Sequence, residues 1–177
     1  MRLFCCQAHS SAIVPSTIPI FSIVADSSQA TGLKWAAPAG GGKVLQVIQA
    51  SDSTVRTRTA TTFATTNVAA TITPSSATSK VLMIVHLSDV GRASGNSMKL
   101  RMVRGATEII KFGSNNGYMN ISGILYMGTN SITYLDSPST TSATTYTVEF
   151  ASMQSGLDVT VSGGDATSTI TLLEIGA

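Results

Sequence analysis

The sequence has few charged residues, few aromatic residues and almost no cysteine. Only 11% of its 177 residues are Asp, Glu, Lys or Arg, against roughly 25% in an average soluble domain. Long surface helices depend on charged, straight-chain side chains, so this shortage disfavours a helical fold. Hydroxyl groups take the place of charge, because the chain has 24 Ser and 24 Thr. With 43% hydrophobic residues the chain is also too apolar for a disordered tail.

The two cysteines, Cys5 and Cys6, are adjacent. Neighbouring residues rarely reach the geometry of a disulfide, and a structural zinc site needs more ligands at wider spacing. We therefore expect no disulfide framework, no cofactor and no metal site within one chain, whereas a metal site shared between chains stays open. The basic residues are scattered and the net charge is only +2, which argues against a surface for nucleic acid.

No run of residues reaches the ~18 consecutive apolar positions that a membrane-spanning helix requires. The first 25 residues are fairly apolar, but polar residues at 7–11 and prolines at 15 and 19 interrupt them. We therefore expect no membrane insertion and no cleaved secretory signal.

Catalytic motifs are missing as well. A Ser nucleophile needs a His base, but His9 lies in the N-terminal segment and His86 lies in an apolar strand, where we expect a structural role. No G-x-S-x-G motif occurs, Gly40-Gly41-Gly42-Lys43 lacks the spacing of a phosphate-binding loop, and no pair of acidic residues is selected as glycosidase carboxylates. The chain is predicted not to be an enzyme, and no catalytic, cofactor-binding or receptor-binding residue is assigned.

Residues 1–42 differ in composition from the rest of the chain. They hold three of the five prolines and end in three consecutive glycines, as a linker does. Their apolar residues at 13–24 would be unfavourable on the surface of a monomer, so we expect them to pack on another chain. We predict an extended N-terminal arm and linker at 1–42 for attachment to another protein, and a β-domain at 43–177. Trp35 is either an anchor that packs on the domain or an exposed platform for glycan stacking.

From Lys43 onward, short β-prone runs alternate with turn residues, as in a β-sandwich or barrel. We predict an antiparallel β-sandwich and leave a jelly-roll topology open. The apolar block Lys80–Leu87 predicts a central strand that is covered on both faces. The predicted strands are 43–49, 55–66, 68–73, 80–87, 98–104, 107–112, 121–127, 131–135, 145–150, 157–161 and 168–175, with turns at 105–106, 114–117 and 162–165.

The nearest approach to a charged patch is formed by Lys99, Arg101 and Arg104, together with Arg92. In a strand, Lys99 and Arg101 share one face and Arg104 takes the other. Two interpretations stay open for this cluster, a solvated strand face or a contact with an anion or a glycan.

The segment 25–38, which reads A-D-S-S-Q-A-T-G-L-K-W-A-A-P, resembles a motif of tail-fibre and related appendage proteins of tailed bacteriophages, where it precedes a C-terminal β-domain. Residues 72–82 resemble the opening of that domain, and residues 168–175 resemble its closing strand. The resemblance implies a non-enzymatic virion protein, usually a homotrimer, whose β-domain is a receptor-binding tip or a surface module. This chain lacks a long repetitive shaft, which fits a short tail fibre, a fibre tip or a capsid decoration protein.

Two functions follow from this resemblance, and both place the protein in the virion as a homo-oligomer that contacts other virion proteins through residues 1–42. In the first, the trimer recognises a glycan or protein of the host surface through loops distal to the arm, of which 88–97, 114–117 and 136–144 are the longest. Several weak sites on one trimer would then act together. In the second, the protein is a capsid decoration protein, and its arm clamps coat subunits to stabilise the head.

Overall fold

The computed structural model describes residues 22–25, 28, 33–36, 43–118, 120, 123 and 125–176. Contacts divide the chain into two units, Met1–Gly40 and Gly41–Ala177. In the first unit, β1 (Ser22–Ala25) pairs antiparallel with β2 (Leu33–Ala36). Most of the predicted arm, with Cys5, Cys6 and His9, lies outside the described residues, as does the side chain of Trp35, so the predictions about the arm stay predictions.

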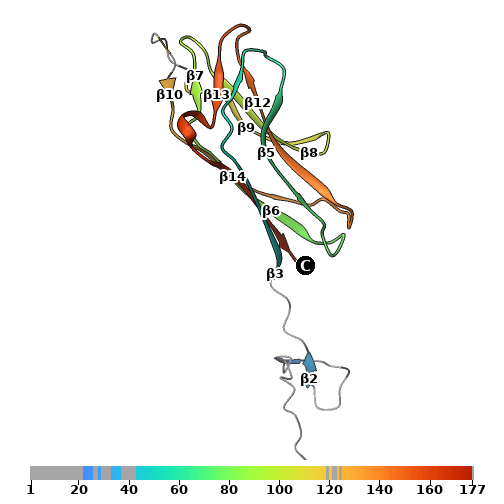
Figure 1. Ribbon diagram of the computed structural model, residues 1–177. Helices are drawn as coiled ribbons and strands as arrows, with labels where there is room; N and C mark the ends of the chain where they lie inside the picture. The colour runs from blue at the N-terminus through green and yellow to red at the C-terminus, as the bar shows by residue number, and fades with distance from the viewer. Residues whose placement is uncertain are drawn as a thin grey trace, which may run out of the picture. The chain divides into compact units, whose positions relative to one another are not determined.

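The second unit is an antiparallel β-sandwich with the strand order of a jelly roll (Figure 1). Sheet I has the order β11-β6-β14-β3 and sheet II the order β5-β12-β8-β9. Each step from one strand of these sheets to the next crosses to the other sheet, except the β8–β9 hairpin, and this alternation defines a jelly roll. The bounds are Val44–Asp52 (β3), Lys80–Leu87 (β6), Asn130–Asp136 (β11) and Ser168–Ile175 (β14) in sheet I, and Ala64–Ile72 (β5), Met98–Arg104 (β8), Thr107–Asn116 (β9) and Thr144–Ser152 (β12) in sheet II. The predicted fold class is confirmed.

A third sheet, of order β10-β7-β13-β4, closes one end of the sandwich (Figure 1). Its strands are β4 (Arg56–Arg58), β7 (Gly91–Arg92), β10 (Leu125–Tyr126) and β13 (Val159–Val161), and each belongs to a different connection between the two large sheets. We call this end the capped end. The opposite end holds Lys43, next to the paired residues Val44 and Ile175, and we call it the Lys43 end.

Alternation along the strands builds the core between sheets I and II. In β6, residues 81, 83, 85 and 87 are buried, whereas 84 and 86 are exposed. Burying one large apolar side chain stabilises the fold by roughly 1.5 to 3 kcal/mol. The inward-facing side chains of sheets I and II belong to a single hydrophobic cluster. Its buried members from these two sheets are Val68, Ala70, Ile72, Val81, Met83, Val85, Leu87, Met98, Leu100, Met102, Tyr146, Val148, Phe150, Ile170 and Leu172.

Strand β6 lies inside sheet I, as its composition predicted, but the prediction that it is covered on both faces is wrong for the single chain. Ile84 is 44% exposed, and His86 is exposed beside it. The outer face of β6 carries Leu82 and Ile84 between Lys80 and His86, and no other element of this domain covers it.

Two other predicted elements are wrong in their bounds. The predicted strand 55–66 is split into β4 and the start of β5, because the Arg58 side chain donates to the carbonyl (2.5 Å) and the hydroxyl (2.6 Å) of Thr62 and holds a turn there. The predicted turn 114–117 begins later, since β9 continues to Asn116 and only Gly117 takes a positive φ of 70°. Residues 121, 122 and 124 of the predicted strand 121–127 lie outside the described residues, and β10 occupies Leu125–Tyr126 of it.

Candidate functional site

The three loops predicted to lie distal to the arm are not at the same end of the domain. Segments 88–97 and 114–117 lie at the capped end, where β7 joins the third sheet. The loop after Asp136 lies at the Lys43 end, since Asp136 pairs with Val81 and Thr144 pairs with Ile72. The prediction is therefore wrong for 136–144. Strand direction decides at which end a loop lies, and the spacing of the predicted strands did not reveal it.

The basic residues divide between the two faces of β8 as predicted, but Arg92 does not belong with them. Lys99 and Arg101 lie on the outer face of sheet II, and Arg104 reaches across to sheet I. Arg92 is 0% exposed and donates to the carbonyl of Ala93 (3.0 Å). Its burial follows from the third sheet, which no pattern in the sequence indicated.

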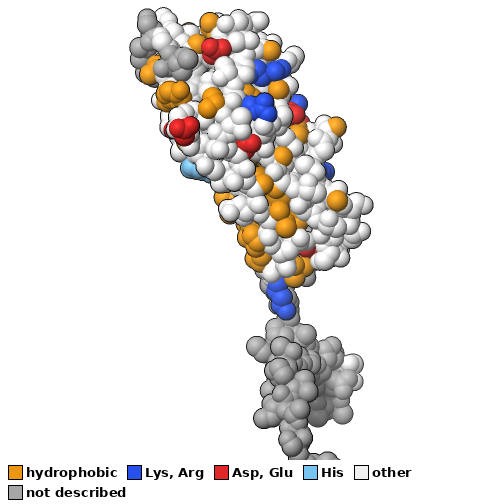
Figure 2. Space-filling model, in the orientation of Figure 1, with side chains coloured by type: hydrophobic (Ala, Val, Ile, Leu, Met, Phe, Trp, Pro, Cys, Tyr) orange, Lys and Arg blue, Asp and Glu red, His pale blue; other side chains and the backbone are white. Residues whose placement is uncertain are grey.

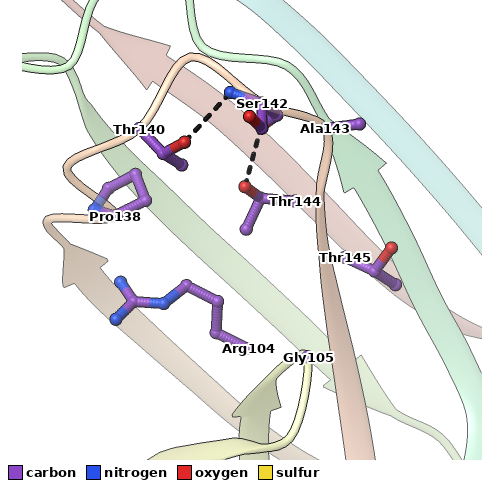
Figure 3. A pocket seen from close by; sticks show the side chains of 8 residues that line it. All are labelled: Arg104, Gly105, Pro138, Thr140, Ser142, Ala143, Thr144 and Thr145. Carbon is purple, nitrogen blue, oxygen red and sulfur yellow. Dashed lines mark hydrogen bonds between the residues drawn. The ribbon is translucent and has the colours of Figure 1, made fainter.

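A pocket of about 430 Å³ opens at the Lys43 end, between the β8–β9 turn and the loop that follows β11 (Figure 3). Half of the residues that line it bear a hydroxyl group, and the full set is Arg104, Gly105, Pro138, Thr140, Ser142, Ala143, Thr144 and Thr145. The loop is held by its own hydrogen bonds, from the Ser142 amide to the Thr140 hydroxyl (3.0 Å) and from the Thr144 hydroxyl to the Ser142 carbonyl (2.9 Å). The predicted loop 136–144 thus lines a pocket, although not at the predicted end.

Arg104 in this pocket is tied to sheet I. Its Nη1 lies 2.6 Å from Oδ2 of Asp136 and also donates to the Ser137 carbonyl (3.3 Å). The hydroxyl of Tyr146 donates to the same Asp136 oxygen (2.8 Å). Burial and the Asp136 carboxylate raise the pKa of Tyr146 well above its usual value, so the phenol stays protonated. Because Asp136 pairs with the Arg104 charge, the pocket offers a ligand uncharged hydroxyl groups beside the apolar surfaces of Pro138 and Ala143.

The outer face of sheet I carries an apolar row that crosses all four strands. Val47, Leu173, Leu82 and Leu135 are neighbours in register from β3 to β11. The ends of the row, Val47 and Leu135, are 55% and 45% exposed. Other apolar side chains adjoin it and are also about half exposed: Val44, Leu45 and Ile84. Figure 2 shows hydrophobic side chains gathered where β3, β6 and β14 lie in Figure 1.

The outer face of sheet II is charged instead. Arg101 bridges Glu108 (3.0 Å) and Glu149 (2.7 Å). A hydrogen bond from Arg101 lowers the pKa of Glu108, which keeps this carboxylate ionised. The guanidinium of Arg101 also lies over the ring of Phe63, 4.2 Å from its centroid. A second pocket, of about 290 Å³, lies beside Phe63 and Lys99.

The His and acidic residues in the part of the chain that the structure describes lie apart from one another. No three residues among His, Cys, Asp and Glu are placed there to hold a metal ion. His86 is exposed on the outer face of sheet I, with Nδ1 3.0 Å from the Ser131 hydroxyl, and the acidic residues of this sheet, Asp52, Asp136 and Glu174, belong to the inward-facing sets of their strands. None of the described residues forms a helix able to cross a bilayer.

No protein-family model and no curated protein sequence matches this chain. Among solved structures, the VP2 subviral particle of infectious bursal disease virus is similar with 15% identity and a TM-score of 0.42, over 89% of this chain and 44% of that chain. The T13 viral particle of the same virus is similar with 16% identity and a TM-score of 0.43, over 89% and 42%. The chain spans less than half the length of each of these viral proteins.

Proposed function

We propose that this protein is a bacteriophage virion protein, a short tail fibre or fibre tip whose trimeric β-domain recognises the host cell surface. The observation that carries the proposal is a segment resembling tail-fibre linkers, residues 25–38, followed by a jelly-roll domain. Jelly rolls recur in capsid and lectin domains. Because a fold alone does not fix a function, the surfaces of the domain have to support the role as well.

The apolar row on sheet I supports the homotrimer. Four neighbouring strands place Val47, Leu173, Leu82 and Leu135 side by side on a face that no other part of the domain covers. Contiguous exposed apolar surface is a mark of protein interfaces, and its burial is favourable by about 25 cal/mol per Å². Three copies packed around an axis parallel to the strands would cover the row and bring the three Lys43 ends together, as three arms with one attachment point require.

Such a trimer would leave the capped end and the outer face of sheet II free for the host. The surface there is mixed, with the ion pairs of Arg101, the ring of Phe63 and a small pocket. Shallow sites of this kind bind weakly one at a time. Three of them on one rigid trimer would gain orders of magnitude in avidity.

Capsid decoration is the second candidate, because a coat subunit could cover the same apolar row of sheet I. The two roles differ in copy number and in what the free protein binds. We would measure copies per particle, and offer labelled full-length protein both to host bacteria and to particles made without it.

The tail-fibre proposal expects few copies per particle and saturable binding of a trimer to host cells. Hundreds of copies on the head and no binding to cells would establish decoration instead. A monomer in solution, by light scattering across the micromolar range, would contradict the trimer.

A further inference from the structure

The pocket of about 290 Å³ on the outer face of sheet II is assembled from four separate segments. Its lining residues are Phe63 before β5, Lys99 in β8, Lys111, Gly113 and Ser114 in β9, and Met153 after β12. The volume is at the lower end of the range for ligand pockets, roughly 300 to 1,000 Å³. A pocket of this size suits one small ring better than an extended chain.

Two ammonium groups line this pocket, and only one of them has a carboxylate partner. Nζ of Lys111 lies 3.3 Å from Oε1 of Glu108. Nζ of Lys99 donates to the neutral carbonyl of Thr61 (2.7 Å) and forms no ion pair with another described residue. The neighbouring carboxylates, Glu108 and Glu149, are both bound by Arg101. The charge of Lys99 is therefore uncompensated, and the pocket favours an anionic group.

Phe63 gives the pocket an aromatic wall that two cations contact. The Arg101 guanidinium lies 4.2 Å from the ring centroid and the Lys99 ammonium 5.6 Å from it, which are distances of favourable cation–π contacts. Met153, 47% exposed, adds a second apolar surface, and Ser114 offers a hydroxyl. An anionic group beside aromatic and apolar walls matches a ring that has both a carboxylate and a C–H face.

We propose that this pocket binds the carboxylated sugar of an acidic saccharide. Lys99 and Lys111 hold the carboxylate, while Phe63 and Met153 pack against the sugar ring. Of the two interpretations that the sequence leaves open for this basic cluster, the proposal takes the contact with an anion or a glycan. This inference names a ligand class for the proposed host recognition. It rests on that proposed function only in placing the saccharide on the host cell surface.

The test is a titration of the full-length protein with saccharides, in which calorimetry or saturation-transfer NMR measures the binding. The probes are a disaccharide that ends in glucuronic acid, the same disaccharide with glucose in that place, and inorganic phosphate. The acidic disaccharide is expected to bind at least tenfold more tightly than the neutral one, and equimolar phosphate is expected not to displace it. Equal affinity for the neutral sugar, displacement by phosphate, or no binding at millimolar concentration overturns the proposal.

Variants locate the site. Lys99→Gln and Lys111→Gln should each weaken binding of the acidic disaccharide at least fivefold, Lys99→Arg should retain it, and Phe63→Leu should weaken both sugars. Lys43→Gln, which removes an exposed charge outside the pocket, is the matched control and should change nothing. Circular dichroism and the melting temperature show whether each variant is folded. A folded Lys99→Gln protein that binds like the wild type overturns the assignment.

Adsorption to host cells, measured on the same proteins, separates this inference from the proposed function. Normal adsorption without any binding of the acidic disaccharide would overturn the inference and leave the proposed function intact. Saccharide binding that depends on Lys99, with no adsorption to cells, would support the pocket and count against host recognition.

Discussion

The two outer faces of the sandwich are built from the same kind of strand but with opposite chemistry. On sheet I, the row Val47, Leu173, Leu82 and Leu135 is apolar from edge to edge. On sheet II, the corresponding surface carries Arg101 with its two carboxylate partners. Both faces are exposed in the single chain, so solvent exposure alone does not explain the difference. The difference is explained if another protein chain covers the outer face of sheet I while solvent or a ligand contacts the outer face of sheet II.

The carboxylates of the two sheets follow the same division. Glu174 in sheet I is 1% exposed and points into the domain, where it accepts from the Ser75 amide (2.7 Å), the Ser75 hydroxyl (2.6 Å) and Nε2 of Gln46 (2.6 Å). Glu108 and Glu149 of sheet II lie on the outside. Turning the acids of sheet I inward leaves its outer face without negative charge, which an apolar interface requires.

The largest expected effect comes from placing charge on the apolar face. The double variant Val47→Asp, Leu135→Asp should raise the dissociation constant of the oligomer at least a hundredfold, because a desolvated, unpaired carboxylate is costly in an interface. Both side chains are about half exposed, so the single chain should remain folded. Sedimentation velocity measures the dissociation.

The matched control for that variant is Thr65→Asp, Thr107→Asp at exposed positions of sheet II, which should leave the oligomer unchanged. An oligomer that survives the sheet I variant, or that dissociates equally in the control, would show that the apolar row is not the interface.

The next effect concerns the buried carboxylate. Glu174→Gln should lower the free energy of unfolding by about 2 kcal/mol at pH 7, because the amide nitrogen that replaces one oxygen cannot accept from its donors. Urea unfolding at fixed protein concentration measures this. Glu149→Gln, a half-buried member of an ion pair on the outer face of sheet II, is the comparison and should cost about 1 kcal/mol or less. Similar losses in both variants would contradict the contrast between inner and outer carboxylates.

The pH dependence of stability gives a third prediction. Burial raises the pKa of Glu174, but hydrogen bonds from Ser75 and Gln46 outweigh it and lower the pKa to about 2, from 4.5 in the unfolded chain. The stabilisation is therefore complete above pH 4.5 and is lost as the pH falls toward 2, by up to about 3 kcal/mol. Glu174→Gln should lack this loss, which acid titration of both proteins would show. Parallel curves for the two proteins would refute the assignment.

The sequence predicted the sandwich because alternation in strands such as 145–150 and 168–175 is a local property. It predicted for the same reason that Lys99 and Arg101 share one face of their strand and that Arg104 lies on the other. The third sheet was missed because β7 is only two residues long, too short to show alternation, and because the predicted strands that contain β4, β10 and β13 gave no sign that they pair with it. The burial of Arg92 was missed for the same reason.

The prediction that β6 is covered on both faces was wrong for a different reason. The block 80–87 is apolar at inward and outward positions alike, and sequence alone does not say whether the second side is covered by the same chain or by another. The pockets depend on contacts between distant segments, such as Phe63 with Arg101 and Arg104 with Asp136, which no local pattern encodes. Several members of the two pockets were singled out beforehand without their being brought together, namely the loop 136–144, the segment 114–117 that begins at Ser114, and the basic residues Lys99 and Arg104.

The smallest expected effect is that of salt on the oligomer. Raising the ionic strength from 0.1 to 1 M shortens the Debye length from about 10 Å to about 3 Å, which weakens exposed ion pairs but leaves apolar contacts intact. The dissociation constant of the proposed trimer should therefore change less than about twofold, whereas the half-buried Arg101–Glu149 pair on the outer face of sheet II should lose part of its small contribution. Sedimentation velocity at both salt concentrations, with Glu149→Gln unfolding measured alongside, tests the two faces together. An oligomer that dissociates in 1 M salt would place its interface on the charged sheet II and reverse the roles of the two faces.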